Sequence, residues 1–230
     1  MAISQAAIGQ HLGEHNLRNT AGQTFSFADL RGKPVVVSMI YTSCHHVCPL
    51  ITRNLAKTVD IATDALGENA FTVVTVGFDW KVDTPERMRQ YAQQQGVDSE
   101  NWHFLSADSN SVATLSENLG FQFFASAKGF DHLAQTTVVD ADGIIYRQVY
   151  GVEIGTQSLV EPLKELVYNT PRSAGLVSHW IDTLKLFCTV YDPTNDRYRF
   201  DYSILMTIFV GLLSLGAVAM FIFHEWRRAR

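Results

Sequence analysis

Two cysteines stand four residues apart in "YTSCHHVCPLI", where Cys44 and Cys48 are separated by two histidines and a valine. Thiolates are nucleophiles, redox partners and ligands for soft metal ions. If a helix begins within this stretch, positions i and i+4 share one face, and the exposed N–H groups at the helix N-terminus favour thiolates. The pair therefore indicates a disulfide, a redox couple or a metal site, with a buried structural pair as the remaining alternative.

The residues around this pair predict the elements that hold it. The run "PVVVSMIY" (34–41) is almost wholly apolar, has the length of a buried strand and leads directly into the cysteine loop. Residues 49–66 follow with the helical spacing of apolar side chains. The cysteines are therefore predicted at the junction between a buried strand and a helix.

The chain up to residue 170 continues this alternation. Strands are predicted at 70–79 and 102–107, helices at 84–96, 109–120 and 158–169, two strands joined by Asp-Gly within 134–151, and a short hairpin and turn at 19–33. This order predicts an α/β fold with a central mixed sheet flanked by helices. A strand, a cysteine loop and a helix near its start are typical of a thioredoxin-like fold, with the site outside the carboxyl ends of the strands.

His132, in "KGFDHLAQTTVV", is a third candidate, because this segment passes beside the cysteine loop in a thioredoxin-like fold. Two thiolates and one imidazole suit copper or zinc better than hard cations, and a closed structural zinc site would need a fourth ligand. Oxidoreductases of this fold carry C-x-x-C and a cis-proline. Here the spacing is one residue longer, and no proline occurs between Pro85 and Pro162. These differences make an ordinary thioredoxin-type redox site a less good match, but a redox pair remains possible.

The segments "YTSCHHVCP", "GFDWKVDTPE" and "GFDHLAQTTVVDADG" occur in this order and together resemble the signature of the Sco (SenC) copper-binding proteins. The resemblance implies that Cys44, Cys48 and His132 bind one copper, as Cu(I) or Cu(II). It implies assembly of the dinuclear copper site of cytochrome c oxidase, with the protein as copper donor, thiol reductant or both. Asp79 and Asp83 match the aspartate pair of the family. The resemblance implies that this pair takes part in docking the copper-site subunit of the oxidase. Other copper chaperones or thiol reductants are further candidate partners.

Two features depart from this family. His45 and His46 stand where it usually has residues of the Pro-Asp type. They could add a ligand or raise the local positive charge, but positions in solvent or behind the metal ligands are favoured. The usual anchor of the family is N-terminal, whereas the apolar segment here is C-terminal.

Two enzymatic alternatives use the same cysteines. A thiol-disulfide oxidoreductase would keep the cysteines of the oxidase subunit reduced and would not require His132. A peroxidase of the same broad fold would use Cys44 as its peroxidatic thiol, although the usual Thr-x-x-Cys context with a nearby proline is poorly matched.

The C-terminal part predicts a membrane anchor. Residues 203–223, "SILMTIFVGLLSLGAVAMFIF", contain no charge and no proline. A helix of this length rises about 30 Å, enough to cross a bilayer. Tyr198, Tyr202 and Trp226 flank it at interface depth. We therefore expect a copper-binding domain at 1–170, a juxtamembrane segment at 171–202, one transmembrane helix at 203–223 and a basic tail at 224–230, with a buried core helix as the alternative for the span.

Three arginines among the last four residues favour a cytoplasmic C-terminus and a domain on the periplasmic side of the inner membrane. The N-terminal sequence "MAISQAAIGQHLGEHNL" has neither the basic nor the apolar region of a signal peptide. Either a signal is missing from this sequence or the protein is tail-anchored and faces the cytoplasm. The first is expected, because copper donation belongs where the oxidase site is assembled.

The overall composition excludes other classes. A net charge of −5 gives no indication of a nucleic-acid partner, and three cysteines are too few for a disulfide scaffold. Cys188 is interpreted as a small apolar filler of the juxtamembrane segment, with a redox or metal contact as the alternative. Surface or packing roles are expected for the isolated histidines, which are His11, His15, His103, His179 and His224.

Overall fold

The computed structural model describes residues 1–127, 129–169, 189–192, 197–200 and 203–228. One seven-stranded sheet, in the order β2-β1-β5-β4-β3-β8-β9, forms its centre. Its strands are β1 (Leu17–Arg18), β2 (Thr24–Phe25), β3 (Val35–Ile40), β4 (Thr72–Gly77), β5 (Trp102–Ala107), β8 (Gln135–Val139) and β9 (Ile145–Tyr150). β3, β4 and β5 are parallel, and β1, β2, β8 and β9 pair antiparallel. The predicted mixed sheet is confirmed.

The two central strands explain why the sheet forms. Every residue of β3 and of β4 is buried, because helices cover both faces at this point. Strands buried on both faces read as continuous apolar runs, and β3 ("VVVSMI") and β4 ("TVVTVG") do so. Val35–Ile40 pairs in register with Thr72–Gly77, so both strands end at the same edge of the sheet.

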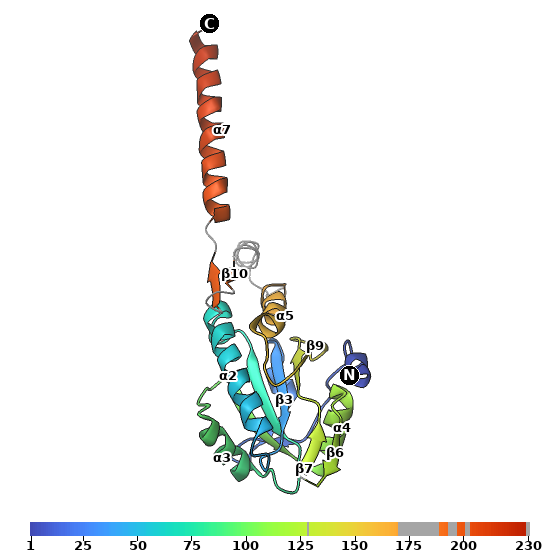
Figure 1. Ribbon diagram of the computed structural model, residues 1–230. Coiled ribbons are helices and arrows are strands. Elements are labelled where there is room, and N and C mark those ends of the chain that lie inside the picture. Colours follow the sequence, from blue (N-terminus) through green and yellow to red (C-terminus); the bar gives the residue numbers. More distant parts are fainter. Residues whose placement is uncertain (128, 170–188, 193–196, 201–202, 229–230) are drawn as a thin grey trace.

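The helices that flank this sheet are α1 (Ala2–Ala6), the 3-10 helix η1 (Phe27–Leu30), α2 (Val47–Leu66), α3 (Pro85–Gln95), α4 (Ser109–Leu119) and α5 (Thr156–Asn169). Of these, α2, α3, α4 and α5 begin and end within a few residues of the predicted bounds, whereas α1 and η1 were not predicted. Thr84 accepts a hydrogen bond from the Arg87 N–H at the start of α3, and Gly96 ends that helix in a left-handed conformation. α2 packs against α3 and α5, and α4 lies on the opposite side of the sheet (Figure 1).

Two local features differ from the sequence-based expectation. A small hairpin, β6 (Phe123–Ser126) with β7 (Gly129–His132), precedes β8 and was not predicted. In addition, α2 begins at Val47, so only Cys48 lies in its first turn and Cys44 stands in the preceding loop. The expectation that both sulfurs lie on one face of a helix is therefore wrong.

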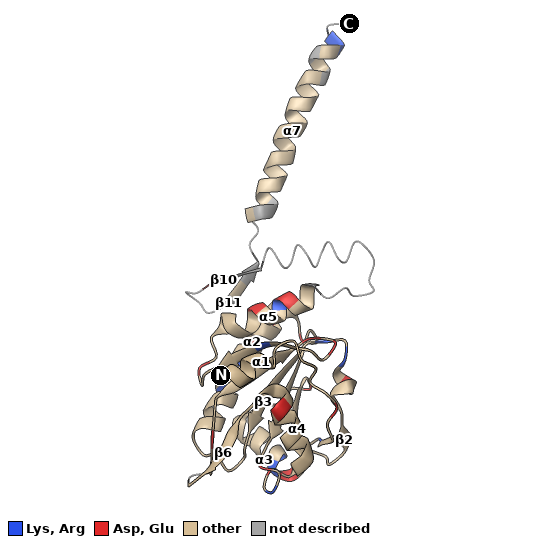
Figure 2. Ribbon diagram, turned by 90° about the vertical axis from the view of Figure 1, so that its right-hand side faces the viewer, with Lys and Arg blue, Asp and Glu red and all other residues tan. Residues whose placement is uncertain are grey.

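The C-terminal helix α7 (Ser203–Arg228) extends away from the rest of the described structure (Figure 1). Its segment Met206–Arg228 is long and apolar enough to cross a membrane, and none of its most apolar window is buried. Lys and Arg appear on this helix only at its end, as Figure 2 shows. Before it, β10 (Thr189–Asp192) and β11 (Arg197–Phe200) form a hairpin, in which the Tyr198 hydroxyl donates to Glu161 of α5 over 2.8 Å.

Candidate metal and thiol site

The cysteine loop leaves the carboxyl end of β3 at the edge of the sheet. The Cys44 N–H donates to the Tyr41 carbonyl over 3.1 Å, which forms a turn and leaves the Cys44 side chain half-buried. Cys48 is fully buried in the first turn of α2. The Cys48 N–H donates to the Cys44 sulfur over 3.2 Å, so the helix N-terminus interacts with the more exposed of two free thiols.

The pKa values of the two thiols are shifted in opposite directions. Partial burial alone would raise the pKa of Cys44, but the N–H groups of Cys48 and His46, the Cys48 thiol and the Tyr41 hydroxyl outweigh it and lower that pKa. Burial raises the pKa of Cys48, and the neighbouring Cys44 and Asp83 raise it further. Cys44 is therefore the more acidic and more exposed thiol of the pair, and Cys48 the less acidic, buried one.

His132 is the last residue of β7, and its side chain contacts the Cys48 thiol. Its Nε2 lies 3.9 Å from the Cys48 sulfur, and its Nδ1 lies 3.1 Å from the Leu133 carbonyl oxygen. Because a carbonyl only accepts, Nδ1 carries the hydrogen and the Nε2 lone pair faces Cys48. Burial lowers the pKa of His132, opposed by the Leu133 carbonyl and by Asp131, so the imidazole is neutral near pH 7.

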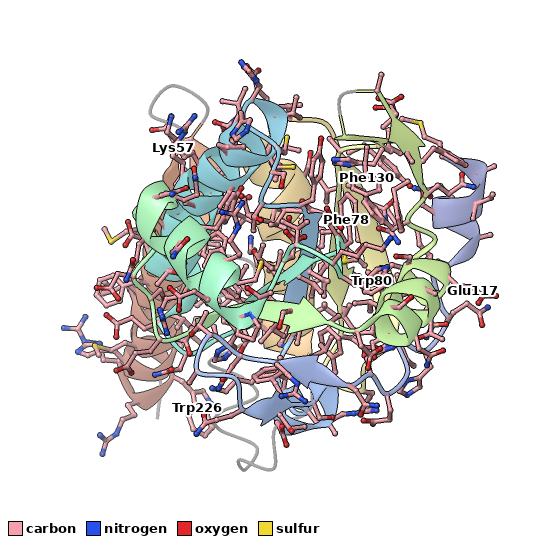
Figure 3. All side chains as sticks on the ribbon, turned by 90° about the horizontal axis from the view of Figure 1, so that it is seen from below. Lys57, Phe78, Trp80, Glu117, Phe130 and Trp226 are labelled. Carbon is pink, nitrogen blue, oxygen red and sulfur yellow. The ribbon has the colours of Figure 1, made fainter. Side chains whose placement is uncertain are left out.

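Aromatic rings surround this imidazole. Its ring centroid lies 6.0 Å from that of Tyr41, 5.4 Å from that of Phe78 and 5.5 Å from that of Phe121. Phe78 also packs against Phe130 at 5.4 Å, and Figure 3 labels both side chains. These rings limit the rotation of the imidazole and keep water from its sides.

The geometry brings together part of the predicted ligand set. Metal–sulfur and metal–nitrogen bonds of about 2.3 and about 2.0 Å, the values for zinc, place two ligands of one ion at most about 4.3 Å apart. The 3.9 Å between the Cys48 sulfur and His132 Nε2 satisfies this limit. Within the described residues, however, no three His, Cys, Asp or Glu side chains already form a metal-binding group. Cys44 accepts the Cys48 N–H and is the third residue of the predicted set.

The two aspartates implied in docking have different environments. Asp83 is 1% exposed, and its carboxylate accepts hydrogen bonds from the Thr42 N–H (2.8 Å), the Thr42 hydroxyl (2.7 Å) and the Asp79 N–H (2.9 Å). Asp83 therefore ties the loop after β4 to the cysteine loop and does not face a partner in this structure. Asp79 is half-exposed. The contact between Thr42 and Asp83 was missed in the sequence, although both residues follow neighbouring parallel strands.

The side chains of the remaining histidines are exposed or packed elsewhere. His45 and His46 are exposed, in keeping with the expected solvent positions. His15 is buried and pairs with the Leu12 carbonyl at 2.7 Å, whereas His103 packs against Phe25, as expected for packing residues. His11 and His224 are exposed. Cys188 and His179 lie outside the described residues.

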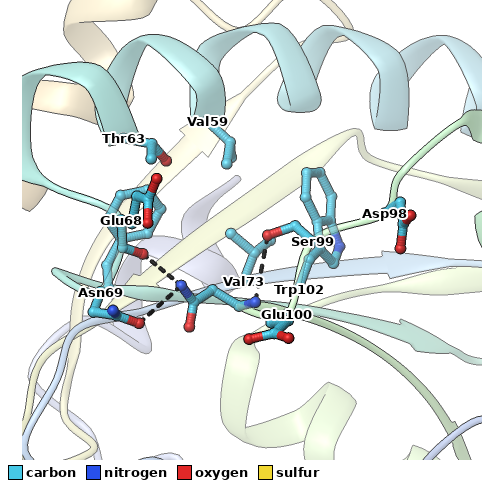
Figure 4. A pocket seen from close by; sticks show the side chains of 11 residues that line it. Val59, Thr63, Glu68, Asn69, Val73, Asp98, Ser99, Glu100 and Trp102 are labelled. Carbon is cyan, nitrogen blue, oxygen red and sulfur yellow. Dashed lines mark hydrogen bonds between the residues drawn. The ribbon is translucent and has the colours of Figure 1, made fainter.

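A cavity of about 380 Å³ lies at the other end of the sheet, between the end of α2 and the starts of β4 and β5. Figure 4 shows Glu68, Asp98 and Glu100 around it, with the Asn101 side-chain amide donating to the Glu68 carbonyl and to Asn69. No Cys or His lines this cavity, so the candidate chemistry stays at the thiol end.

A free dithiol that faces an imidazole in a thioredoxin-like domain has the groups that thiol exchange and soft-metal binding require. The chain matches the SCO1/SenC family model over residues 4–168, and it belongs to that family. A SCO1 protein homolog of Bacillus subtilis (strain 168) is 26% identical over 141 residues, which are 59% of this chain and 72% of the relative.

Solved Sco structures share the fold. ScoI of Arabidopsis thaliana, solved with copper bound, has a TM-score of 0.59 at 17% identity, covering 66% of this chain and 96% of that one. BsSco, described with a disulfide switch and as a member of the Sco family of cytochrome c oxidase assembly proteins, has a TM-score of 0.57 at 19% identity, covering 68% and 93%. The thioredoxin-like fold is confirmed, and the family includes copper-binding members.

Proposed function

We propose that this chain is a membrane-anchored copper chaperone that assists assembly of the dinuclear copper site of cytochrome c oxidase. Its cargo is one copper ion held by Cys44, Cys48 and His132. The observation that carries the proposal is the contact between Cys48 and His132, in which Nε2 lies 3.9 Å from the sulfur while Nδ1 is occupied by the Leu133 carbonyl. This arrangement aims a lone pair at a thiol, as a shared metal requires.

The three residues have distinct roles in this proposal. Thiolates suit Cu(I), and the imidazole helps to hold Cu(II). Cys44, the more exposed and more acidic thiol, is where copper is exchanged with the cysteines of a client. Cys48 and His132 form the inner side of the site, where the aromatic rings exclude water. The copper-bound Arabidopsis ScoI supports copper as the cargo.

The experiment is a copper titration of the reduced full-length chain in detergent, with Cu(I) and Cu(II) under argon. Wild type is expected to bind one tight copper with a thiolate-to-copper absorption band. Cys44→Ala and Cys48→Ala should lose it, and His132→Ala should weaken Cu(II) binding by about 100-fold or more, since loss of a residue that merely supports a ligand already costs about 10–100-fold. His46→Ala is the matched control, because this histidine is exposed within the same loop. Unchanged Cu(II) affinity in His132→Ala would remove His132 from the site.

A second candidate function is reduction of client disulfides, favoured by the opposite pKa shifts of Cys44 and Cys48. The Cys44 thiolate would attack a client disulfide and form a mixed disulfide. Cys48 would then attack Cys44, releasing the client as a dithiol and leaving the chain oxidised by two electrons. The disulfide switch described for BsSco supports this role. Reductase turnover that survives His132→Ala, without copper retention, would favour it over the chaperone.

We propose that α7 anchors the chain in the inner membrane, with the domain of residues 1–170 on the periplasmic side. The span of 203–223, a preceding segment at 171–202 and a basic tail at 224–230 complete this organisation. Arg227 and Arg228 in the last turn of α7 support a cytoplasmic C-terminus. A Sco relative from Bacillus anthracis is described as a lipoprotein, which also supports attachment to a membrane.

A further inference from the structure

Tyr41 joins the cysteine loop to the hairpin that carries His132. It follows β3 directly, and its side chain is buried. Its carbonyl accepts the Cys44 N–H over 3.1 Å, so its backbone is part of the turn that presents this cysteine. Its hydroxyl accepts the Phe130 N–H over 3.5 Å, so its side chain reaches β7. One residue therefore contacts both the loop and the strand that supply the proposed copper ligands.

The Tyr41 hydroxyl satisfies a backbone donor of this hairpin. N–H groups along a strand point alternately to its two sides, so the Phe130 N–H that reaches Tyr41 points away from β6. The ladder between β6 and β7 therefore does not pair this donor, and a half-buried N–H without a partner costs free energy. Removal of the hydroxyl would loosen the attachment of β7 to the end of β3.

The Tyr41 ring also contacts the imidazole of His132. Phe130 and His132 stand two residues apart on β7 and therefore share one face of that strand. Both rings meet the Tyr41 ring edge-on, with centroids 5.3 and 6.0 Å away and interplanar angles of 77° and 82°. Edge-to-face packing at these separations is a favoured arrangement of aromatic rings. The position of the imidazole therefore depends on the position of Tyr41.

The hairpin is built to let Tyr41 approach. Gly129, the residue before Phe130, has a φ of +118°. An added Cβ at this glycine would lie 2.9 Å from the Tyr41 hydroxyl and 3.0 Å from a carbon of its ring. Any side chain here would push the phenol away from β7. The close contact thus depends on both partners, the hydroxyl of Tyr41 and the bare backbone of the hairpin.

These contacts bear on one oxidation state of copper more than on the other. In the proposed function the thiolates suit Cu(I), whereas the imidazole helps to hold Cu(II). The Tyr41 hydroxyl bonds the strand that ends in His132. The N–H groups of Cys44 and Cys48 are bonded instead to a carbonyl and a sulfur, which Tyr41→Phe would keep. The hydroxyl also interacts with the Cys44 thiol, so its loss should weaken Cu(I) binding slightly and Cu(II) binding more.

We propose that Tyr41 is a positioning residue that holds His132 in place and thereby raises the affinity of the site for Cu(II) relative to Cu(I). This inference rests on the proposed function and adds to it the residue that governs which oxidation state of copper is retained. Tyr41 acts through Phe130 and the strand β7, which carry the imidazole to the thiols.

The test titrates the reduced full-length chain in detergent, under argon, with Cu(I) and separately with Cu(II). Tyr41→Phe keeps the ring and removes the hydroxyl. It is expected to lower the Cu(II) affinity by about 10-fold, the lower end of the range for residues that support a metal ligand, and to change the Cu(I) affinity less. The thiolate-to-Cu(II) absorption band should shift. In the copper-free chain, amide hydrogen exchange at Phe130 should become faster.

Tyr91→Phe is the matched control. Tyr91 is also buried, and its hydroxyl lies within hydrogen-bond distance of the Thr52 hydroxyl, 2.9 Å away on α2. The control therefore removes one buried hydroxyl contact, as Tyr41→Phe does, but not a contact to the hairpin. It should leave the ratio of the Cu(I) and Cu(II) affinities, the absorption band and the exchange at Phe130 unchanged.

The outcomes separate the role of Tyr41 from the proposed function. Unchanged Cu(II) affinity in Tyr41→Phe overturns the positioning role, and so do equal losses of Cu(I) and Cu(II) affinity or unchanged exchange at Phe130. Absence of tight copper in wild type defeats the chaperone function itself. Tight copper in wild type with unchanged Cu(II) binding in Tyr41→Phe defeats only the role of Tyr41.

Discussion

At the scale of single residues, the site gains its chemistry from unequal environments of similar groups. Cys44 and Cys48 are the same side chain, but one receives backbone N–H groups at a helix start and the other is buried in apolar surroundings. The hydrogen bond from His132 Nδ1 to the Leu133 carbonyl fixes the tautomer of the imidazole. The sequence identified these three residues by type and order, but burial and hydrogen bonding, which follow only from the fold, assign their roles.

The two thiols should alkylate at different pH. In a Cys188→Ser background, iodoacetamide is expected to label Cys44 with a midpoint below the usual thiol pKa of 9.0, because hydrogen bonds stabilise its thiolate. Cys48 should label only at higher pH, because its pKa is raised by burial. Mass spectrometry of peptides labelled across a pH series measures both midpoints. Equal midpoints, or labelling of Cys48 first, would contradict the assignment of Cys44 as the more acidic thiol.

His132 should make the stability of the copper-free protein depend on pH. Its pKa is lowered by burial from the usual 6.5, so the unfolded chain binds the proton first as the pH falls. The contribution of His132 to stability is therefore complete above pH 6.5 and is lost as the pH falls towards the folded pKa. Urea unfolding between about pH 7 and about pH 5 should show a shallower pH dependence in His132→Phe than in wild type. Equal slopes in the two proteins would refute the prediction.

At the scale of elements, the ends of neighbouring strands fix the site. β3 and β4 end side by side, and the loops that follow them are joined by Asp83 and Thr42. Gly77, the last residue of β4, allows this approach: an added Cβ would lie 2.5 Å from the Asp83 Cβ and 2.8 Å from the Met88 sulfur. The close contact between the two loops therefore requires a residue without a side chain at this position.

Gly77→Ala is expected to lower the free energy of unfolding by about 1–3 kcal/mol, as for other insertions into a packed interior. Displacement of Asp83 should also loosen Thr42 and weaken copper binding. Urea unfolding and copper titration measure the two effects. Gly155→Ala is the matched control, because its added Cβ meets no atom closer than 3.3 Å and that atom is a serine hydroxyl. A wild-type stability in Gly77→Ala would show that the loop pair tolerates a side chain there.

The hairpin β6–β7 marks the limit of prediction from sequence at this scale. Its strands have four residues each; β6 lacks alternating exposure, and β7 alternates over too short a run to identify a strand from sequence. The turn requires Gly129, whose φ is +118° and whose added Cβ would approach the Tyr41 hydroxyl to 2.9 Å. Tertiary contact with Tyr41 on the other side of the site thus determines a hairpin that local sequence does not.

At the scale of the whole molecule, the mixed sheet and the bounds of the longer helices followed from the sequence because buried strands, helix caps and glycine stops leave local patterns. β3 and α4, with its Asp108 cap and its left-handed Gly120, are examples. The site depends instead on residues 84 positions apart, Cys48 and His132, whose proximity was inferred only from the fold type. Their distance and the burial of Asp83 arise from packing between elements, and the sequence of a single segment does not reveal such packing.

The orientation of the whole chain can be tested with its own thiols. If α7 spans the inner membrane with the domain outside, a membrane-impermeant maleimide should label Cys44 of Cys188→Ser protein in intact spheroplasts. Labelling should disappear in Cys44→Ser, since Cys48 is buried. In a chain whose native cysteines are all replaced by serine, Arg228→Cys should label only after lysis, because the basic end of α7 is expected in the cytoplasm. Labelling of Arg228→Cys in intact spheroplasts, together with protection of Cys44, would show the opposite orientation. The domain would then face the cytoplasm, away from the compartment in which the proposed client receives its copper.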